Sequence, residues 1–209
     1  MDPDFRRDNE AIGVRIAGDS DGVIVAAMLA RAFADDPAVG FIFPDKAERL
    51  KRLPRLFSLL FDQDSQGLRL VTAGGEAATL WREPGRNRTS RIDMLLHAWP
   101  MWRAFGGALG RAMAVSDAID AHFPSGDYWY LHIAGCDPAA QRRGFGGAAV
   151  RAGLDRIAGS KLPVHLETAT ERNLGFYRGF GFEVTGEWTV PKGGPRFWSM
   201  MRAAGPTPD

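Results

Sequence analysis

Three glycines and two arginines lie close together in residues 141–147, "QRRGFGG". They follow the β-rich run "YWYLHIAGC" and lead directly into "GFGGAAVRAGLDRIAG", where Val150, Leu154 and Ile157 fall on one face of a helix. A strand, a glycine turn and a helix leave unpaired backbone N–H groups at the helix N-terminus, and glycine lets another group approach them closely. The sequence therefore predicts a site for a phosphate or a pyrophosphate on this turn.

Two other interpretations of the turn stay open. "GFGGAA" fits the dinucleotide-binding pattern G-x-G-x-x-A, and Glu167 ends the next predicted strand, where an acid that binds ribose would fall. A dinucleotide turn should follow its strand directly, however, whereas here "CDPAAQRR" intervenes and Pro138 ends the strand early. The turn could also simply pack a helix against a strand, without any ligand.

The remaining sequence predicts a mixed α/β fold. Its 209 residues suit one domain, and a hydrophobic content of 45% is enough for a substantial core. We expect helices at "GVIVAAMLARAFA" and "KAERLKRLPRLFSLLFD", then a hairpin at "LRLVTAGGEAATLWREPG" that turns at Gly74 and Gly75. The second half reads strand, glycine turn, helix, strand, helix, strand, strand. A single domain over 11–202 is expected, with flexible tails at 1–10 and 203–209.

Composition argues against several classes of partner. The formal charge of +1, from 26 basic and 25 acidic residues, does not suggest a nucleic-acid surface. The single cysteine, Cys136, excludes an internal disulfide and a multi-thiolate metal site, so no metal is expected. The run "GVIVAAMLA" is too short to span a bilayer, and "MDPDFRRDNE" lacks the apolar core of a signal peptide. We expect a soluble cytoplasmic protein with neither nucleic acid nor membrane as a partner.

Two motifs together resemble a known family. "LHIAGCDPAAQRRGFGGAAVRAGLDRI" resembles the acetyl-CoA-binding motif of the GNAT superfamily of N-acetyltransferases, in which Gln141, Gly144 and Gly146 fill the signature Q/R-x-x-G-x-G/A. "LETATERNLGFYRGFGF" resembles the second landmark of that family, with Asn173 and Tyr177 before a Gly-Phe turn.

This resemblance is strong over 128–202, weaker over 11–84 and weakest across 86–127, and it is greatest to the branch that includes puromycin N-acetyltransferase. It implies a GNAT-like, mostly antiparallel sheet of about six to seven strands, flanked by helices and splayed at the acetyl-CoA site.

The resemblance implies acetyl-CoA as the co-substrate. The turn would hold its pyrophosphate through backbone N–H groups, and the side chains of Arg142 and Arg143 either reach phosphate or are solvated surface charges. Amides of the preceding strand near Ala134 and Cys136 would bind the pantetheine, and Asn173 would cap its helix and contact the cofactor. The expected cofactor-binding residues of the turn are Gln141, Arg142, Arg143, Gly144, Phe145, Gly146 and Gly147.

Tyr177 matches the general acid of the family, because a tyrosine with a pKa of about 10 stays protonated and can protonate the departing CoA thiolate. The structural alternative is a tyrosine packed under the final sheet. Some family members place a carboxylate on the strand before the CoA loop, but "YWYLHIAG" has none. Glu167 and His132 are the nearest substitutes for the general base, and His122 and His97 are the next candidates. The general base stays unassigned at this point.

The expected function is acetyl-CoA-dependent N-acetylation of a primary amine of a small molecule by direct attack. The acceptor site would lie in residues 33–43 and in the variable helical segment 86–127, whose aromatic residues either belong to the core or line a cleft for a hydrophobic or aromatic amine. The alternative is a non-catalytic acetyl-CoA-binding sensor or interaction module, which could lose Tyr177 without losing its ligand. The closing strands could pair two subunits in a homodimer.

Overall fold

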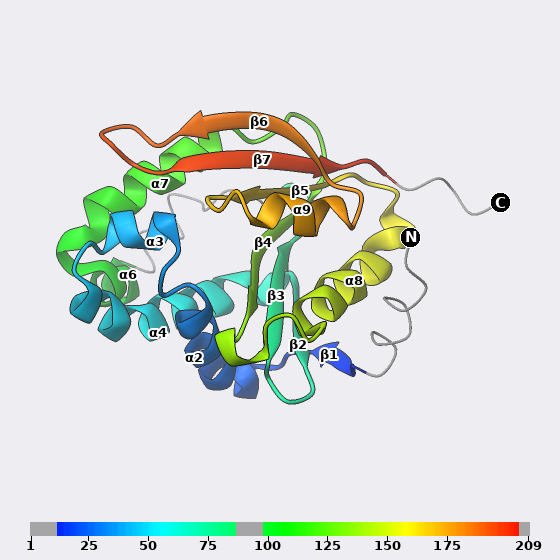
Figure 1. Cartoon of the computed structure of the whole chain (residues 1–209), viewed down its shortest axis with the longest axis horizontal. Coiled ribbons are helices and arrows are strands. Elements are labelled where there is room, and N and C mark those ends of the chain that lie inside the picture. Colours follow the sequence, from blue (N-terminus) through cyan, green and yellow to red (C-terminus); the bar gives the residue numbers. More distant parts are fainter. Residues whose placement is uncertain (1–11, 87–97, 205–209) are drawn as a thin grey trace.

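The computed structural model describes residues 12–86 and 98–204 (Figure 1). The tail expected at 1–10, residues 205–209 of the other tail, and residues 87–97 of the variable segment lie outside these ranges. Within the described ranges, no helix combines the length and the apolarity needed to cross a lipid bilayer.

A seven-stranded sheet organises the described residues, in the order β1-β2-β3-β4-β5-β7-β6. All neighbouring strands are antiparallel except β4 and β5, which are parallel. The predicted mixed, mostly antiparallel fold is therefore confirmed, and the topology differs from the doubly wound parallel sheet that a dinucleotide turn requires. The strands are β1 (Val14–Ile16), β2 (Leu68–Thr72), β3 (Ala77–Arg82), β4 (Trp129–Cys136), β5 (Val164–Thr168), β6 (Glu183–Thr189) and β7 (Arg196–Arg202).

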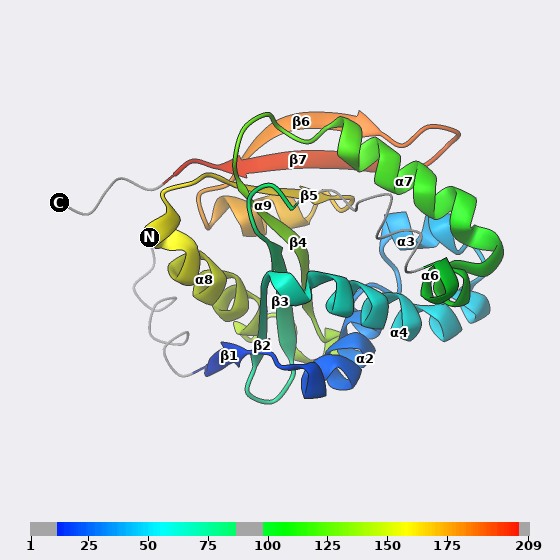
Figure 2. The same ribbon diagram turned by 180° about the vertical axis from the view of Figure 1, so that it is seen from behind.

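Helices cover both faces of the sheet. Figure 1 looks onto the face of α8 (Phe145–Ile157) and α9 (Asn173–Arg178), and Figure 2 shows the reverse, with α4 (Lys46–Gln63) and α7 (Leu109–Ala121) in front. The remaining helices are α2 (Gly22–Ala32), α3 (Pro37–Ile42) and α6 (Ala98–Phe105). Short 3-10 turns join several elements: η1 (Asp19–Asp21), η2 (Asp64–Gln66), η3 (Gly106–Ala108), η4 (Pro138–Ala140) and η5 (Ala158–Ser160).

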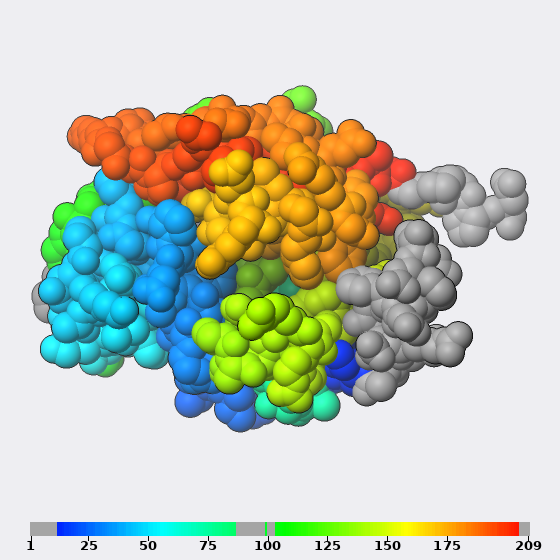
Figure 3. Space-filling model, viewed as in Figure 1, coloured from blue at the N-terminus to red at the C-terminus, as the bar shows by residue number. Residues whose placement is uncertain are grey.

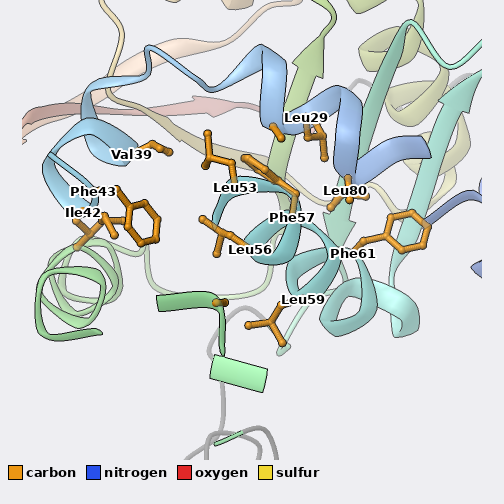
Figure 4. Packing of buried hydrophobic residues seen from close by; sticks show 14 of the residues in the cluster. Leu29, Val39, Ile42, Phe43, Leu53, Leu56, Phe57, Leu59, Phe61 and Leu80 are labelled. Carbon is orange, nitrogen blue, oxygen red and sulfur yellow. The ribbon is translucent and has the colours of Figure 1, made fainter. Parts of the chain in front are cut away.

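Helix α4 supplies much of the core on its side of the sheet. Asp45 begins the helix by accepting a hydrogen bond from the Glu48 amide at 2.7 Å. Leu53, Phe57 and Phe61 recur at helical spacing and are buried against α2 and the sheet (Figure 4). Each such side chain contributes about 1.5–3 kcal/mol when fully buried. This packing fixes the end of α4, and with it the turn η2, beside β3.

Helix α8 packs on the other face, against β2, β3 and β4. Val150, Leu154 and Ile157 are buried there, as their spacing predicted. At Gly153 an added Cβ would lie 2.2 Å from the Trp81 ring, so only glycine permits this approach of the helix to β3. The close contact fixes where the N-terminus of α8, and the glycine turn before it, meet β4.

Strands β4 and β5 form a fork. They pair only at Trp129 with Val164 and at Tyr130 with His165, although β4 continues to Cys136 and β5 to Thr168. Beyond Tyr130 and His165 the two strands part. The splay that the sequence implied is therefore present, and it opens towards the glycine turn that follows β4.

Candidate active site

The glycine turn has the backbone geometry of an anion site. Gly144 precedes α8 with a φ of 89°, in the left-handed region, and Arg142 has a φ of 62°. Left-handed residues at alternate positions turn successive N–H groups towards one side and form a concave nest. The first N–H groups of α8 have no partner inside the helix, and the positive end of its dipole adds to them. The turn can therefore bind a phosphate through its backbone.

The protein's own packing does not demand glycine at position 146. A Cβ added to Gly146 would meet only the Cβ of Cys136, at 3.6 Å, which is an ordinary contact. The absence of a side chain instead leaves the space beside Cys136 open to a ligand. Gln141 ties the turn to the strand, because its Nε2 donates to the Cys136 carbonyl at 3.4 Å.

The two arginines of the turn are exposed, and neither makes an ion pair with another described residue. The Arg143 guanidinium lies 5.2 Å from the centroid of the Phe145 ring. Both guanidinium groups therefore lie next to the nest. This position fits phosphate binding, and it fits solvated surface charges equally well.

The free arm of β4 presents amides to the fork. The Asp137 N–H donates to the Glu76 carbonyl at 2.8 Å, on the side of β3. Because N–H directions alternate along a strand, those of Ala134 and Cys136 point away from β3, into the opening left by β5. Burial raises the pKa of the Cys136 thiol, which makes it a poor nucleophile and speaks against an acyl carrier.

Figure 3 shows that the surface is hollowed where three segments meet: the yellow-green residues of the glycine turn, the gold residues of α9, and the blue residues of α2 and α3. Tyr177 of α9 is buried. Burial, and then the charge of Asp36, raise the pKa of Tyr177 to about 12, so the phenol stays protonated at every physiological pH. Asp36 is held in place as the cap of α3, by the amides of Ala38 and Val39.

Asn173 does not cap α9, and this prediction is wrong. The helix begins at Asn173, with Arg172 in the capping position and no capping hydrogen bond from its side chain. The Asn173 side chain instead reaches back from the first turn, and its Nδ2 donates to Thr168 Oγ1 at 3.3 Å. This bond ties α9, and therefore Tyr177, to the free end of β5.

On the opposite face of the fork, polar side chains gather from both arms: Tyr130 and His132 from β4, and His165 and Glu167 from β5. A bulge in β4 contributes to this arrangement. Leu80 of β3 pairs with Ile133 and Trp81 pairs with Leu131, so His132 is the extra residue. Bulges locally re-aim a side chain, and here the His132 ring turns towards η2 at the end of α4.

His132 is bonded to a residue that the sequence did not indicate. Its Nδ1 lies 2.6 Å from Oδ2 of Asp64, while Oδ1 of Asp64 accepts from Arg82 Nε at 2.7 Å. The Asp64 side chain is completely buried. Burial by itself would raise the pKa of Asp64, but His132 and Arg82 outweigh it and bring that pKa below its ordinary value.

Glu167 forms the second carboxylate–histidine pair of the fork. Its Oε1 lies 2.5 Å from His165 Nε2, and both side chains are at most 2% exposed. Oε2 of Glu167 receives no hydrogen bond from the described residues. Tyr130 lies next to this carboxylate, and burial followed by the Glu167 charge raises the Tyr130 pKa well above its usual value. Glu167 faces away from the glycine turn, so it is not placed to bind a ribose there.

The other predicted histidines have different surroundings. His122 stacks on Trp188 with ring centroids 4.3 Å apart, and its Nδ1 lies 2.7 Å from the Ala118 carbonyl. Those contacts give it a structural role at the end of α7. His97 lies outside the described residues. Of the aromatic residues expected near an acceptor, Phe43 and Phe105 are buried in the core, whereas Trp99 is exposed.

The fold is found in solved structures of acetyltransferases. One of them is described as histone acetyltransferase HPA2 and related acetyltransferase, from Corynebacterium glutamicum. It superposes on this structure with a TM-score of 0.68 at 24% sequence identity, and the match covers 94% of this chain and 98% of that one. Polyamine N-acetyltransferase from Drosophila melanogaster has a TM-score of 0.58 at 15% identity, covering 92% of this chain and 99% of that one. A GNAT family acetyltransferase from Brucella melitensis, in complex with acetyl-CoA, has a TM-score of 0.50 at 17% identity, covering 95% of this chain and 91% of that one. The chain has the fold of the GNAT acetyltransferases. No family model matches the sequence.

Within this GNAT fold, the fork has two chemically different sides. The glycine turn and the free amides of β4 lie at its open end, with Tyr177 on the helix that follows β5. His132 and Glu167 project from the two arms on the opposite face of the sheet, together with Tyr130 and His165. A ligand inserted between β4 and β5 would therefore reach from the glycine turn at one end to the side chains of His132 and Glu167 at the other.

Proposed function

We propose that the protein is an acetyl-CoA-dependent N-acetyltransferase that acts on a primary amine of a small molecule by direct attack. The observation that carries this proposal is the fork between β4 and β5, which opens beside the anion-binding turn and has His132 and Glu167 on its two arms. Support comes from structures of the same fold that are named as amine acetyltransferases, for polyamines and for arylalkylamines. The motif likeness to the puromycin N-acetyltransferase branch also favours a small-molecule acceptor.

The residues present fit acetyl-CoA as co-substrate. The N–H groups of residues 142–147 would hold the pyrophosphate, and the position of Gly146 leaves the approach open. The amides of Ala134 and Cys136 would bind the pantetheine in the place where β5 has left β4. Asn173, through its bond to Thr168, would hold α9 against the end of β5, on the side of the opening away from β4.

The bound co-substrate supplies an activated acetyl thioester, and the protein moves two protons. His132 takes the proton from the amine nitrogen as the N–C bond forms, and Tyr177 gives a proton to the sulfur as the C–S bond breaks. We assign to Glu167 the role of orienting the amine, because its carboxylate lies on the arm of the fork opposite His132. An N–H of the β4 arm directed at the thioester oxygen would lower the barrier by about 3–4 kcal/mol.

The decisive test is calorimetric titration of the purified protein with acetyl-CoA, with NADH as the control, followed by thiol-release assays on a panel of primary amines. We expect acetyl-CoA to bind, NADH not to bind, and at least one amine to release CoA. Failure of acetyl-CoA to bind would remove the proposal. Tight binding without turnover of any amine would favour the sensor or interaction module instead.

A further inference from the structure

Asp64 connects two strands at the fork through its two carboxylate oxygens. Oδ2 faces His132 of β4 and Oδ1 faces Arg82 of β3, at 2.6 and 2.7 Å. The carboxylate is inaccessible to solvent, and its two partners are only 15% and 13% exposed. A buried carboxylate held on both oxygens has a single orientation, and so has the imidazole bonded to it.

We propose that Asp64 is a positioning residue that holds the His132 ring with its proton on Nδ1, so that Nε2 accepts the proton at the fork, and that Arg82 fixes the other oxygen of the same carboxylate. This inference rests on the proposed acetyltransferase function for its catalytic meaning. The bulge in β4 contributes to this arrangement, because it leaves His132 without a pairing partner on β3 and turns its side chain towards η2.

The hydrogen-bond pattern determines the tautomer. An ionised carboxylate can only accept hydrogen bonds, so a neutral His132 must carry its proton on Nδ1, next to Oδ2. Nε2 is then the ring nitrogen that can take a proton from the amine. Histidine in catalytic triads is oriented by a carboxylate in the same way.

Burial and the charge of Arg82 keep the His132 ring neutral. Arg82 of β3, Asp64 of η2 and Glu167 of β5 act on it, and Tyr130 lies beside it with ring centroids 5.5 Å apart. Burial and then Arg82 lower the pKa of His132, and together they outweigh the opposite effects of Asp64 and Glu167. The imidazole is therefore in its basic form at neutral pH.

The structure predicts what an amide at position 64 would do. In Asp64→Asn, the carbonyl oxygen stays with Arg82 Nε, which needs an acceptor, and the NH₂ group is left facing His132 Nδ1. The imidazole must then accept at Nδ1 and carry its proton on Nε2, which is the wrong tautomer for a base. The corresponding change in a Ser-His-Asp triad lowers kcat about 10⁴-fold.

The test is two-dimensional ¹H–¹⁵N NMR of the histidine rings in the full chain, with the His132 signal assigned through His132→Gln. We expect the Nδ1–H tautomer in the wild type and the Nε2–H tautomer in Asp64→Asn, with kcat lowered about 10²-fold or more. In Arg82→Gln, we expect the Nδ1–H tautomer to persist and the pKa of His132 to rise. Asp62→Asn is the matched control, since Asp62 is exposed on α4 two residues earlier and should change neither tautomer nor kcat.

An Nε2–H tautomer in the wild type would overturn the proposal, as would an unchanged tautomer and kcat in Asp64→Asn. Should Asp64→Asn fail to fold, Arg82→Gln still decides, because a His132 pKa that does not move would contradict the coupling. If the wild type acetylates no amine, the proposed function fails. The ring spectra then still report whether Asp64 orients His132.

Discussion

Tyr130 and His165 are the last paired residues of β4 and β5, and beyond them the two strands separate. Their rings lie on one face of the sheet, with centroids 6.0 Å apart. Phe123 packs edge-on against both rings and closes this end of the fork. The result is an opening with a rigid base, in which His132 and Glu167 are held on separate arms.

Tyr177→Phe tests the general acid. We expect kcat to fall about 10²-fold or more, because no other proton donor is assigned to the leaving thiolate. The melting temperature should change little, since the ring stays in place and no described residue forms a hydrogen bond with the Tyr177 hydroxyl, whose pKa is raised by burial and by the charge of Asp36. Turnover at the wild-type rate for every accepted amine would show that Tyr177 is not the acid.

Gly146→Val tests the anion site. A side chain there would project from the turn, where the described residues offer only the Cβ contact with Cys136. We expect the Kd for acetyl-CoA to rise at least about tenfold, a change of about 1.4 kcal/mol, with the fold retained. Gly159→Val is the control, because an added Cβ there meets nothing within 4 Å and the site is at the other end of α8. Equal affinity in the two variants would contradict the assignment.

The pH dependence of kcat/KM reports the base. Since the pKa of His132 is lowered, the neutral imidazole persists below the ordinary value of about 6.5, and the acidic limb of the profile should lie below that pH. The profile should be measured with a weakly basic acceptor amine whose own pKa lies well below that of the imidazole, so that the amine stays neutral and adds no limb of its own. In His132→Gln the limb should disappear along with most of the activity. A limb above the ordinary histidine pKa would contradict this assignment.

Glu167→Gln separates orientation from proton transfer. The neutral amide should bind a cationic or N–H-donating amine more weakly, so KM for the amine should rise about tenfold. Removing the Glu167 charge also removes an influence that raises the His132 pKa, so the acidic limb should move to still lower pH. Complete loss of the limb in this variant, with KM unchanged, would make Glu167 the base in place of His132.

Stability should fall on acidification because of the same cluster. Asp64 and His132 both have folded-state pKa values below their ordinary values, so the unfolded chain binds more protons than the folded one. The His132 contribution is lost below about pH 6.5 and the Asp64 contribution below about pH 4. We expect thermal unfolding to show a steeper loss of melting temperature between pH 7.5 and 5 in the wild type than in His132→Gln. Parallel curves would refute the coupling.

Local patterns in the sequence were enough to predict the helix α8, the hairpin and the glycine turn. Val150, Leu154 and Ile157 predicted the buried face of α8 because helical spacing is a property of neighbouring residues. The same holds for the hairpin around Gly74 and Gly75, and for the turn at Gly144, whose backbone needs the left-handed region that glycine favours. The residues that carry these patterns lie close together in the sequence, so the patterns can be recognised without knowledge of the fold.

The bond between Asp64 and His132 could not be predicted from the sequence, because it depends on the tertiary structure. Asp64 and His132 are 68 residues apart, and nothing near Asp64 in the sequence distinguishes it from the other acids at the end of α4. Their bond depends on where α4 ends against the sheet and on a bulge that follows from strand register. Hydrogen bonds and charges act over a few ångströms in space, whatever the separation along the chain.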